Sequence, residues 1–228
     1  MQPTCTQLSF YDSILQMQTV TEIALERAAR GIFTRQEAAY WTNDSGARLN
    51  ALLKRSVGAG EVWRIRRGLY CLDKRYLHSS VNPLELAQRI HGPSYISLES
   101  GLSYHGWIPE AVYAITSTSL DRSRSFDTPL GVFSFTRVPQ TQFFIGVSRI
   151  ETENGGSFLM ADPLKALADY VYVHHCKWDS VTPVLESLRV DEDSLAELKA
   201  DSFDPLMNNY RAGLVQRFLA GFRKDLGL

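Results

Sequence analysis

The sequence predicts an α+β protein with two domains, residues 1–78 and residues 79–228. Helical periodicity followed by two short β-prone runs marks the first part, whereas β-prone runs alternate with helices in the second. Charge is divided unevenly, because the first part has a net charge of +4 and the second a net charge of −5. A short polar stretch that ends in Pro83, a residue that favours helix starts, separates the two parts.

The overall composition is that of a globular protein. Hydrophobic residues make up 44% of the chain and charged residues 21%, which is enough apolar material to fill a core. No run of about 18 apolar residues is present, so we expect no membrane span. The polar N-terminus lacks the pattern of a signal peptide, so we expect none. Cys5, Cys71 and Cys176 lie far apart, without the spacing of a disulfide framework or a zinc ribbon. We therefore expect a cytoplasmic protein.

The first domain is expected to begin with two helices. Apolar residues at helical spacing predict a helix over residues 13–30, with Gly31 as its C-terminal cap. Thr34 and Glu37 then form a capping-box pattern, in which each side chain bonds the backbone amide of the other residue. This pattern predicts a second, short helix over residues 35–41.

A third helix is expected over residues 45–57, after a polar turn. Leucines form its apolar stripe, whereas Arg48, Ala51 and Arg55 share another face. A helix with one apolar and one basic face, reached by a short turn, is typical of the recognition helix of a helix-turn-helix. The alternative is a solvated basic face that binds nothing.

Two β-prone runs follow the third helix, over residues 61–66 and 69–72, and Gly68 suits the tight turn between them. From Arg48 to Arg75 there are eight basic residues and only two acidic ones. A local positive surface on a near-neutral chain indicates nucleic-acid binding, although the arginines of the first run could instead protect a strand edge. The order of elements favours a winged helix-turn-helix.

We expect three groups of side chains in this domain to contact double-stranded DNA. The group at the start of the second helix, where backbone amides favour anions, comprises Thr34, Arg35 and Gln36. The group expected to meet base edges in the major groove comprises Ser45, Arg48, Asn50 and Ala51. The group expected to hold phosphates or the minor groove comprises Lys54, Arg55, Arg64, Arg66 and Arg67.

The second domain is expected to combine a mixed sheet with helical cover and a helical tail. The expected strands are 95–96, 111–117, 131–138, 143–151 and 157–160. The expected helices are 83–91, 97–107, 164–173, 181–188, 194–200, 205–210 and 212–225, with Ser97 and Asp162 as N-caps. Residues 120–128 are rich in Ser, Arg and Asp and are expected to form an exposed loop.

Several blocks of this sequence resemble the AbiEi-type antitoxins of bacterial abortive-infection toxin–antitoxin systems. The blocks similar to their winged-helix domain are GIFTRQEAA at 31–39, LLKR at 52–55 and WRIRRGLY at 63–70. The blocks similar to their C-terminal domain are PSYISLESGL at 93–102, closed by His105 and Gly106, and ADPLKALAD at 161–169. Gly101 stands where the family more often has Ala, and the final helices match least.

The resemblance implies a division of labour between the two domains. The winged helix would bind inverted repeats upstream of its own operon and repress it, as a dimer or cooperatively. The C-terminal domain would counteract a nucleotidyltransferase-like toxin without a stable complex. It implies no catalytic residue, metal or cofactor.

A search for enzyme motifs gives little support to catalysis. The sequence lacks G-x-S-x-G, P-loop and G-x-G-x-x-G patterns. Adjacent residues such as His174, His175 and Cys176 point in different directions, which disfavours a metal site. Asp191, Asp193, Glu197 and Lys199 fit the solvated face of a helix better than a nuclease site.

A ligand-responsive regulator without a toxin partner is the alternative function. In that case the second domain would bind a small molecule that tunes DNA affinity. The aromatic residues that could line such a pocket, or simply belong to the core, are Tyr95, Tyr104, Trp107, Tyr113, Phe143 and Phe144.

Overall fold

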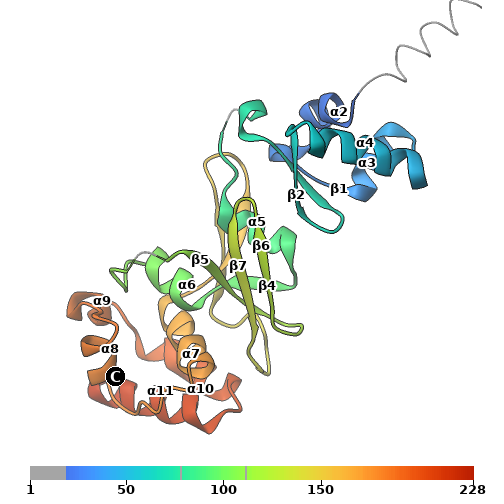
Figure 1. The fold of residues 1–228 in the computed structure, drawn as a ribbon. Coiled ribbons are helices and arrows are strands. Elements are labelled where there is room, and N and C mark those ends of the chain that lie inside the picture. Colours follow the sequence, from blue (N-terminus) through green and yellow to red (C-terminus); the bar gives the residue numbers. More distant parts are fainter. Residues whose placement is uncertain (1–18, 78, 111) are drawn as a thin grey trace, which may run out of the picture. The chain divides into compact units, whose positions relative to one another are not determined.

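The computed structural model describes residues 19–77, 79–110 and 112–228. The chain divides into two compact units, and the division lies between Val81 and Asn82 (Figure 1). Each unit contains both helices and strands, so the predicted α+β class is confirmed. No helix within the described residues is long and apolar enough to cross a membrane.

The N-terminal unit consists of a small sheet packed with three helices. The helices are α2 (Val20–Arg27), α3 (Arg35–Thr42) and α4 (Gly46–Gly58). The strands are β1 (Ile32–Thr34), β2 (Val62–Arg66) and β3 (Leu69–Leu72), arranged antiparallel in the order β1-β3-β2. Two short 3₁₀ turns, Ala29–Gly31 and Lys74–Tyr76, complete the described elements of this unit.

The prediction of a continuous helix to residue 30 is wrong at its C-terminal end. The helix α2 stops at Arg27, and Arg30 and Gly31 both take positive φ angles of 55° and 73°. This reversal turns the chain into β1, where pairing with β3 satisfies the backbone. The predicted start, over residues 13–18, lies outside the described residues.

The capping box at the start of α3 is confirmed. The Thr34 amide donates to Glu37 Oε2 at 2.6 Å, and the Glu37 amide donates to Thr34 Oγ1 at 3.1 Å. The helix ends at Asn43, which adopts the left-handed conformation with a φ of 51°. These two signals hold α3 in a short segment between the sheet and α4.

Strand β1 is absent from the sequence-based prediction. Its three residues pair with β3, with Phe33 opposite Tyr70, and the two rings stack with their centroids 5.7 Å apart. Because β3 lies between β1 and β2, all four of its residues are buried. Buried apolar side chains from the helices and the sheet form one core, which comprises Val20, Ala24, Phe33, Ala38, Leu49, Leu53, Val62, Tyr70 and Leu72.

The C-terminal unit is built on a six-stranded mixed sheet in the order β6-β7-β5-β4-β9-β8 (Figure 1). Its strands are β4 (Ser94–Ile96), β5 (Ala114–Ser119), β6 (Arg124–Thr128), β7 (Gly131–Arg137), β8 (Val147–Glu151) and β9 (Ser157–Ala161). The pairs β4–β9 and β5–β7 are parallel, and the other neighbouring pairs are antiparallel.

Two strand predictions in this unit are wrong. Residues 124–128 form the edge strand β6 rather than a loop, because they pair with β7 and the Phe126 ring packs edge-on against Phe135. The strand predicted over residues 143–151 begins only at Val147, since Gly146 takes a positive φ of 69°. Tertiary contacts outweigh local preference in both segments.

Seven helices in the described residues accompany this sheet. They are α5 (Pro83–Ile90), α6 (Leu98–Tyr104), α7 (Pro163–Val173), α8 (Thr182–Glu186), α9 (Glu192–Ala196), α10 (Phe203–Asn209) and α11 (Gly213–Asp225). Asp162 caps α7 as predicted, accepting from the Lys165 amide at 2.7 Å. Helices α6 and α7 approach closely, since a Cβ placed on Gly101 would lie 3.0 Å from the Ala166 methyl group.

A buried polar cluster, here called the Asp169 network, lies inside this unit. Lys165 Nζ lies 3.1 Å from Asp169 Oδ1, and both side chains are fully buried. Hydroxyl groups donate to the same carboxylate from Tyr95, Ser97, Thr118 and Tyr210. Ser97 is the N-cap residue of α6 as predicted, but its hydroxyl makes no capping bond and donates instead to Asp169 Oδ2 at 2.8 Å.

Candidate nucleic-acid interface

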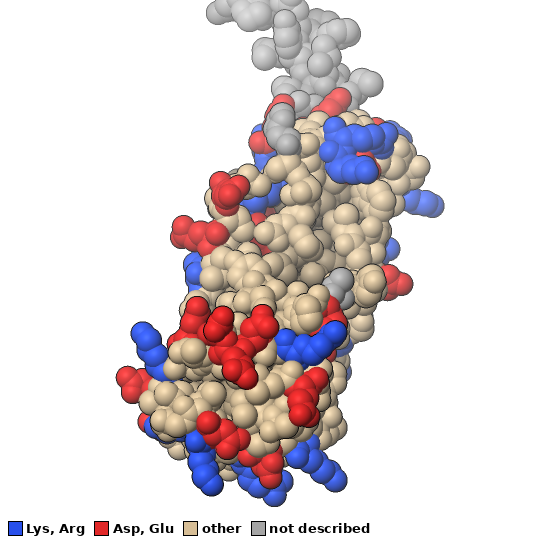
Figure 2. All heavy atoms as spheres, turned by 90° about the vertical axis from the view of Figure 1, so that its left-hand side faces the viewer, with Lys and Arg blue, Asp and Glu red and all other residues tan. Residues whose placement is uncertain are grey.

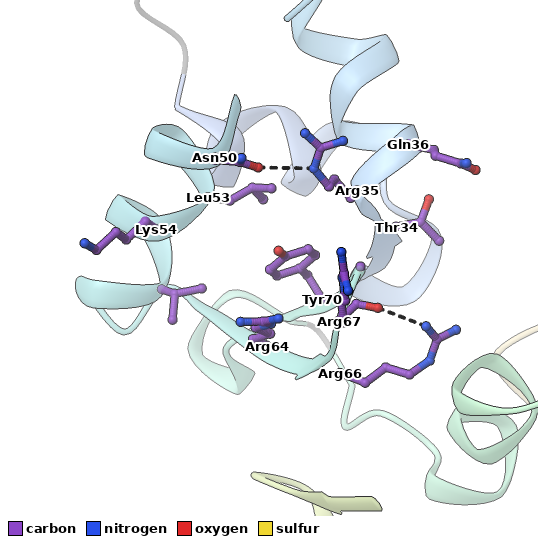
Figure 3. A pocket seen from close by; sticks show the side chains of 12 residues that line it. Thr34, Arg35, Gln36, Asn50, Leu53, Lys54, Arg64, Arg66, Arg67 and Tyr70 are labelled. Atoms are coloured by element: carbon purple, nitrogen blue, oxygen red, sulfur yellow. Dashed lines mark hydrogen bonds between the residues drawn. The ribbon is translucent and has the colours of Figure 1, made fainter. Parts of the chain in front are cut away.

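A cavity of about 1060 Å³ opens in the N-terminal unit between α3, α4 and the β2–β3 hairpin (Figure 3). Side chains from all three elements surround it, and the Tyr70 ring lies among them. The lining residues are Thr34, Arg35, Gln36, Asn50, Leu53, Lys54, Val57, Arg64, Arg66, Arg67, Gly68 and Tyr70.

The lining of this cavity is strongly cationic. It includes five basic side chains, and none of the described residues that line it is acidic. Like charges gathered around one concave surface reinforce each other's potential, which attracts an anionic ligand. The side chains come from α3 (Arg35), α4 (Lys54) and β2 with its turn (Arg64, Arg66 and Arg67).

Arg35 connects the start of α3 to α4. Its Nε donates to Asn50 Oδ1 at 3.2 Å (Figure 3). A guanidinium group can only donate, so the oxygen of Asn50 faces Arg35 and its NH₂ group remains to donate elsewhere. The pair thus places one donor-bearing amide and one cation at the rim of the cavity.

The tip of the hairpin is held against α3 by the backbone. The Arg35 amide donates to the Gly68 carbonyl at 3.0 Å, and Gly68 has a φ of 79° that favours glycine. Arg66 Nη1 donates to the Arg67 carbonyl at 3.0 Å (Figure 3), and partial burial lowers the pKa of the Arg66 guanidinium. The arginines on the hairpin therefore have a defined position relative to α3.

Asp73 fixes the other end of the hairpin. Its carboxylate accepts from Trp63 Nε1 at 2.6 Å and from Arg75 Nε at 2.8 Å. Arg75 in turn donates to the Gly60 carbonyl, at 2.7 Å, in the turn between α4 and β2. Donation from the Arg75 amide, then from its guanidinium and from the Trp63 indole, lowers the pKa of Asp73 to about 2. These bonds join both strands to the end of α4.

Eight of the twelve predicted contact residues line the cavity. The other four, Ser45, Arg48, Ala51 and Arg55, are exposed on or next to α4 but do not line it. Arg48 Nε forms an ion pair with Asp44 Oδ2 at 3.2 Å. The sequence-based list omits Leu53, Val57, Gly68 and Tyr70, and the only signal for Tyr70 is its position just after the basic turn.

The C-terminal unit presents a different surface. Acidic side chains gather on the face of this unit that is visible in Figure 2. A smaller cavity of about 470 Å³ is lined by His175, Lys177, Trp178, Asp179, Leu214 and Arg217. None of the six aromatic residues considered for a ligand pocket lines either cavity, and three of them, Tyr95, Trp107 and Phe143, are buried in the core.

The residues considered for metal binding are not assembled into a site. His174 Nε2 lies 2.7 Å from Glu99 Oε1, and no cluster of three or more His, Cys, Asp or Glu side chains within the described residues could hold a metal ion. Cys71 and Cys176 are free thiols, and Cys5 lies outside the described residues.

Comparisons with known proteins do not identify the chain. No family model matches it, and no curated protein matches it.

Proposed function

We propose that residues 19–77 form a winged helix-turn-helix that binds double-stranded DNA, and that the chain is a transcriptional repressor. The observation that carries this proposal is the convergence of five basic side chains, with no acidic one among the described lining residues, on a cavity between α4 and the hairpin. The order helix, strand, helix, helix, hairpin supports it, because a winged helix has the same order.

In this proposal α4 is the recognition helix. Its exposed residues Arg48, Asn50 and Ala51, with Ser45 just before it, would face base edges in the major groove. The hairpin arginines and Lys54 and Arg55 would neutralise phosphates or enter the adjacent minor groove. The Arg35 and Gln36 side chains would meet the DNA backbone at the start of α3.

The antitoxin part of the proposal is supported by the sequence resemblance to AbiEi-type antitoxins. The chain would repress its own operon from an inverted repeat, in the cytoplasm, and its C-terminal unit would counteract a nucleotidyltransferase-like toxin. Co-expression with the product of the neighbouring gene tests this role. Growth arrest that this chain relieves is the expected outcome, and unrelieved arrest contradicts it.

DNA binding is tested by fluorescence anisotropy with the duplex upstream of the gene, at several salt concentrations. If the five cavity cations neutralise five phosphates, the logarithm of affinity falls with the logarithm of salt at a slope of about −4.5. Removing two of these cations in an R66A/R67A variant is expected to reduce the slope to about −2.7 and to weaken binding to all duplexes alike.

The matched control removes two exposed arginines from the C-terminal unit in an R137A/R149A variant. Its affinity and salt slope are expected to equal those of the unsubstituted chain. Equal losses in both variants would mean that net charge, rather than the cavity, governs binding, and would overturn the proposed interface.

A further inference from the structure

Tyr70 places a hydroxyl group inside the cationic cavity. Its side chain is only 8% exposed, yet it lines the cavity (Figure 3). Its hydroxyl makes no hydrogen bond to another described residue, and the oxygen atom is not fully buried, so it is open to the cavity. A tyrosine hydroxyl that is open to a cavity can donate a hydrogen bond to a ligand bound there.

The ring of Tyr70 is held independently of its hydroxyl. It lies in the central strand β3, opposite Phe33 of β1 and Arg64 of β2, and it stacks against Phe33. Phenylalanine would fill this part of the core equally well, so packing does not explain the hydroxyl. The oxygen atom therefore has a role outside the core.

The groups around the hydroxyl define the chemistry of the ligand. Arg35, Arg64 and Arg67 line the same cavity, and the labelled side chains surround Tyr70 on several sides in Figure 3. A hydroxyl donor among cations complements an acceptor that carries negative charge, as a phosphate oxygen does. Bases are neutral and would leave those guanidinium groups without an anionic partner.

We propose that one backbone phosphate of the bound duplex enters this cavity and accepts a hydrogen bond from the Tyr70 hydroxyl. The proposal rests on the proposed function, since it names the part of DNA that the cavity takes. It adds an uncharged contact to a set of contacts that is otherwise cationic. Tyr70 is thus a binding residue that contributes affinity without sequence preference and without charge neutralisation.

The test compares a Y70F variant of the full chain with an R67A variant by fluorescence anisotropy. Y70F is expected to weaken binding about tenfold, or about 1.4 kcal/mol, to the upstream duplex and to an unrelated duplex alike. Its salt slope is expected to stay unchanged, because no charge is removed. R67A is expected to lower the magnitude of the slope by about 0.9.

Several outcomes would overturn this assignment. Unchanged affinity in Y70F, or a loss confined to the upstream duplex, would show that Tyr70 does not contact a phosphate. Calorimetric titration with inorganic phosphate separates the two sources of phosphate. A phosphate site that Y70F removes while duplex affinity stays constant assigns the cavity to a free anion and overturns the proposal.

Two controls keep the inference distinct from the proposed function. Equal melting temperatures of Y70F and the unsubstituted chain are expected, because the ring still stacks on Phe33. If the unsubstituted chain binds no duplex at any salt concentration, the proposed function fails, and this inference fails with it. If that chain binds and only the Y70F result deviates, the Tyr70 assignment alone fails.

Discussion

Two ion pairs with the same sequence spacing have opposite surroundings in this molecule. Asp44 and Arg48 pair at the start of α4, where their side chains are 16% and 60% exposed. Lys165 and Asp169 pair on α7, where both are 0% exposed. The first pair remains in contact with water and other solutes, whereas the second is enclosed by protein.

The surroundings of the buried pair explain how it can persist. Lys165 Nζ also contacts the Gln140 side chain at 2.5 Å and the Tyr210 hydroxyl at 2.6 Å. Burial lowers the pKa of Lys165, and the Asp169 carboxylate opposes this shift. Burial also raises the pKa values of Tyr95 and Tyr210 well above their usual range. The Lys165–Asp169 pair thus belongs to the core of the C-terminal unit, whereas the Asp44–Arg48 pair lies at the surface of the N-terminal unit.

The largest expected effect concerns the buried pair. A K165M variant removes the cationic partner of the fully buried Asp169 side chain, so we expect a loss of about 3–5 kcal/mol in the free energy of unfolding. Urea denaturation followed by tryptophan fluorescence measures it. Trp107 and Trp178 lie in or against the core of the C-terminal unit and report on its unfolding.

An exposed ion pair in the same unit is the matched control. Arg223 Nη1 lies 2.6 Å from Asp204 Oδ1, with the two side chains 28% and 65% exposed. An R223A variant is expected to lose no more than about 1 kcal/mol. If K165M loses as little as R223A, the contrast between buried and exposed charge does not hold for this chain.

Local signals in the sequence were sufficient to predict most elements of the N-terminal unit. The capping box of Thr34 and Glu37 and the turn at Gly68 depend on neighbouring residues only, and both are present. Strand β1 could not be predicted, because three residues give no periodicity and its pairing partner lies about 40 positions later. Strand β6 could not be predicted for a different reason: its polar composition is typical of a loop, although it pairs with the next strand along the chain.

The candidate site, too, could be predicted from the sequence only in part. Charge counting along the sequence was enough to select the arginines of the hairpin, and the structure brings them to one cavity. Charge counting could not select Tyr70, because this uncharged residue reaches the cavity only through the folding of β3 between β1 and β2. The Asp169 network could not be predicted from the sequence either. Its members approach Asp169 from distant parts of the chain, and they are Tyr95, Thr118, Gln140 and Tyr210.

An effect smaller than that of K165M is expected for Arg48, which belongs to the exposed ion pair. If Arg48 reads a base, an R48A variant loses about 1–3 kcal/mol of discrimination between the upstream duplex and an unrelated one. Stability is expected to change by less than about 1 kcal/mol, since Arg48 pairs only at the surface. Anisotropy titrations with both duplexes measure the discrimination.

Arg55 provides the control for Arg48 on the same helix. It is exposed further along α4, and we expect it to contact a phosphate. An R55A variant should therefore weaken binding to both duplexes by the same factor and leave the discrimination intact. Should R48A behave like R55A, Arg48 contacts the DNA backbone and another residue of α4 reads the sequence.

The smallest expected effect concerns Asp73, a carboxylate of the N-terminal unit that is only 6% exposed and accepts several hydrogen bonds. Its pKa in the folded state is about 2, mainly because the Arg75 amide and guanidinium and the Trp63 indole donate to it. Since the folded pKa lies below the ordinary value of about 3.9, the carboxylate stabilises the fold above that value. This contribution is lost as pH falls towards 2.

A D73N variant separates this contribution from those of other carboxylates. The difference in unfolding free energy between the unsubstituted chain and D73N is expected to stay constant from about pH 7 to pH 5 and to shrink between about pH 4 and pH 2. Denaturation at a series of pH values measures it. A difference that does not vary with pH would mean that Asp73 holds the hairpin through geometry alone. Its charge would then have no part in fixing the arginines around the cavity.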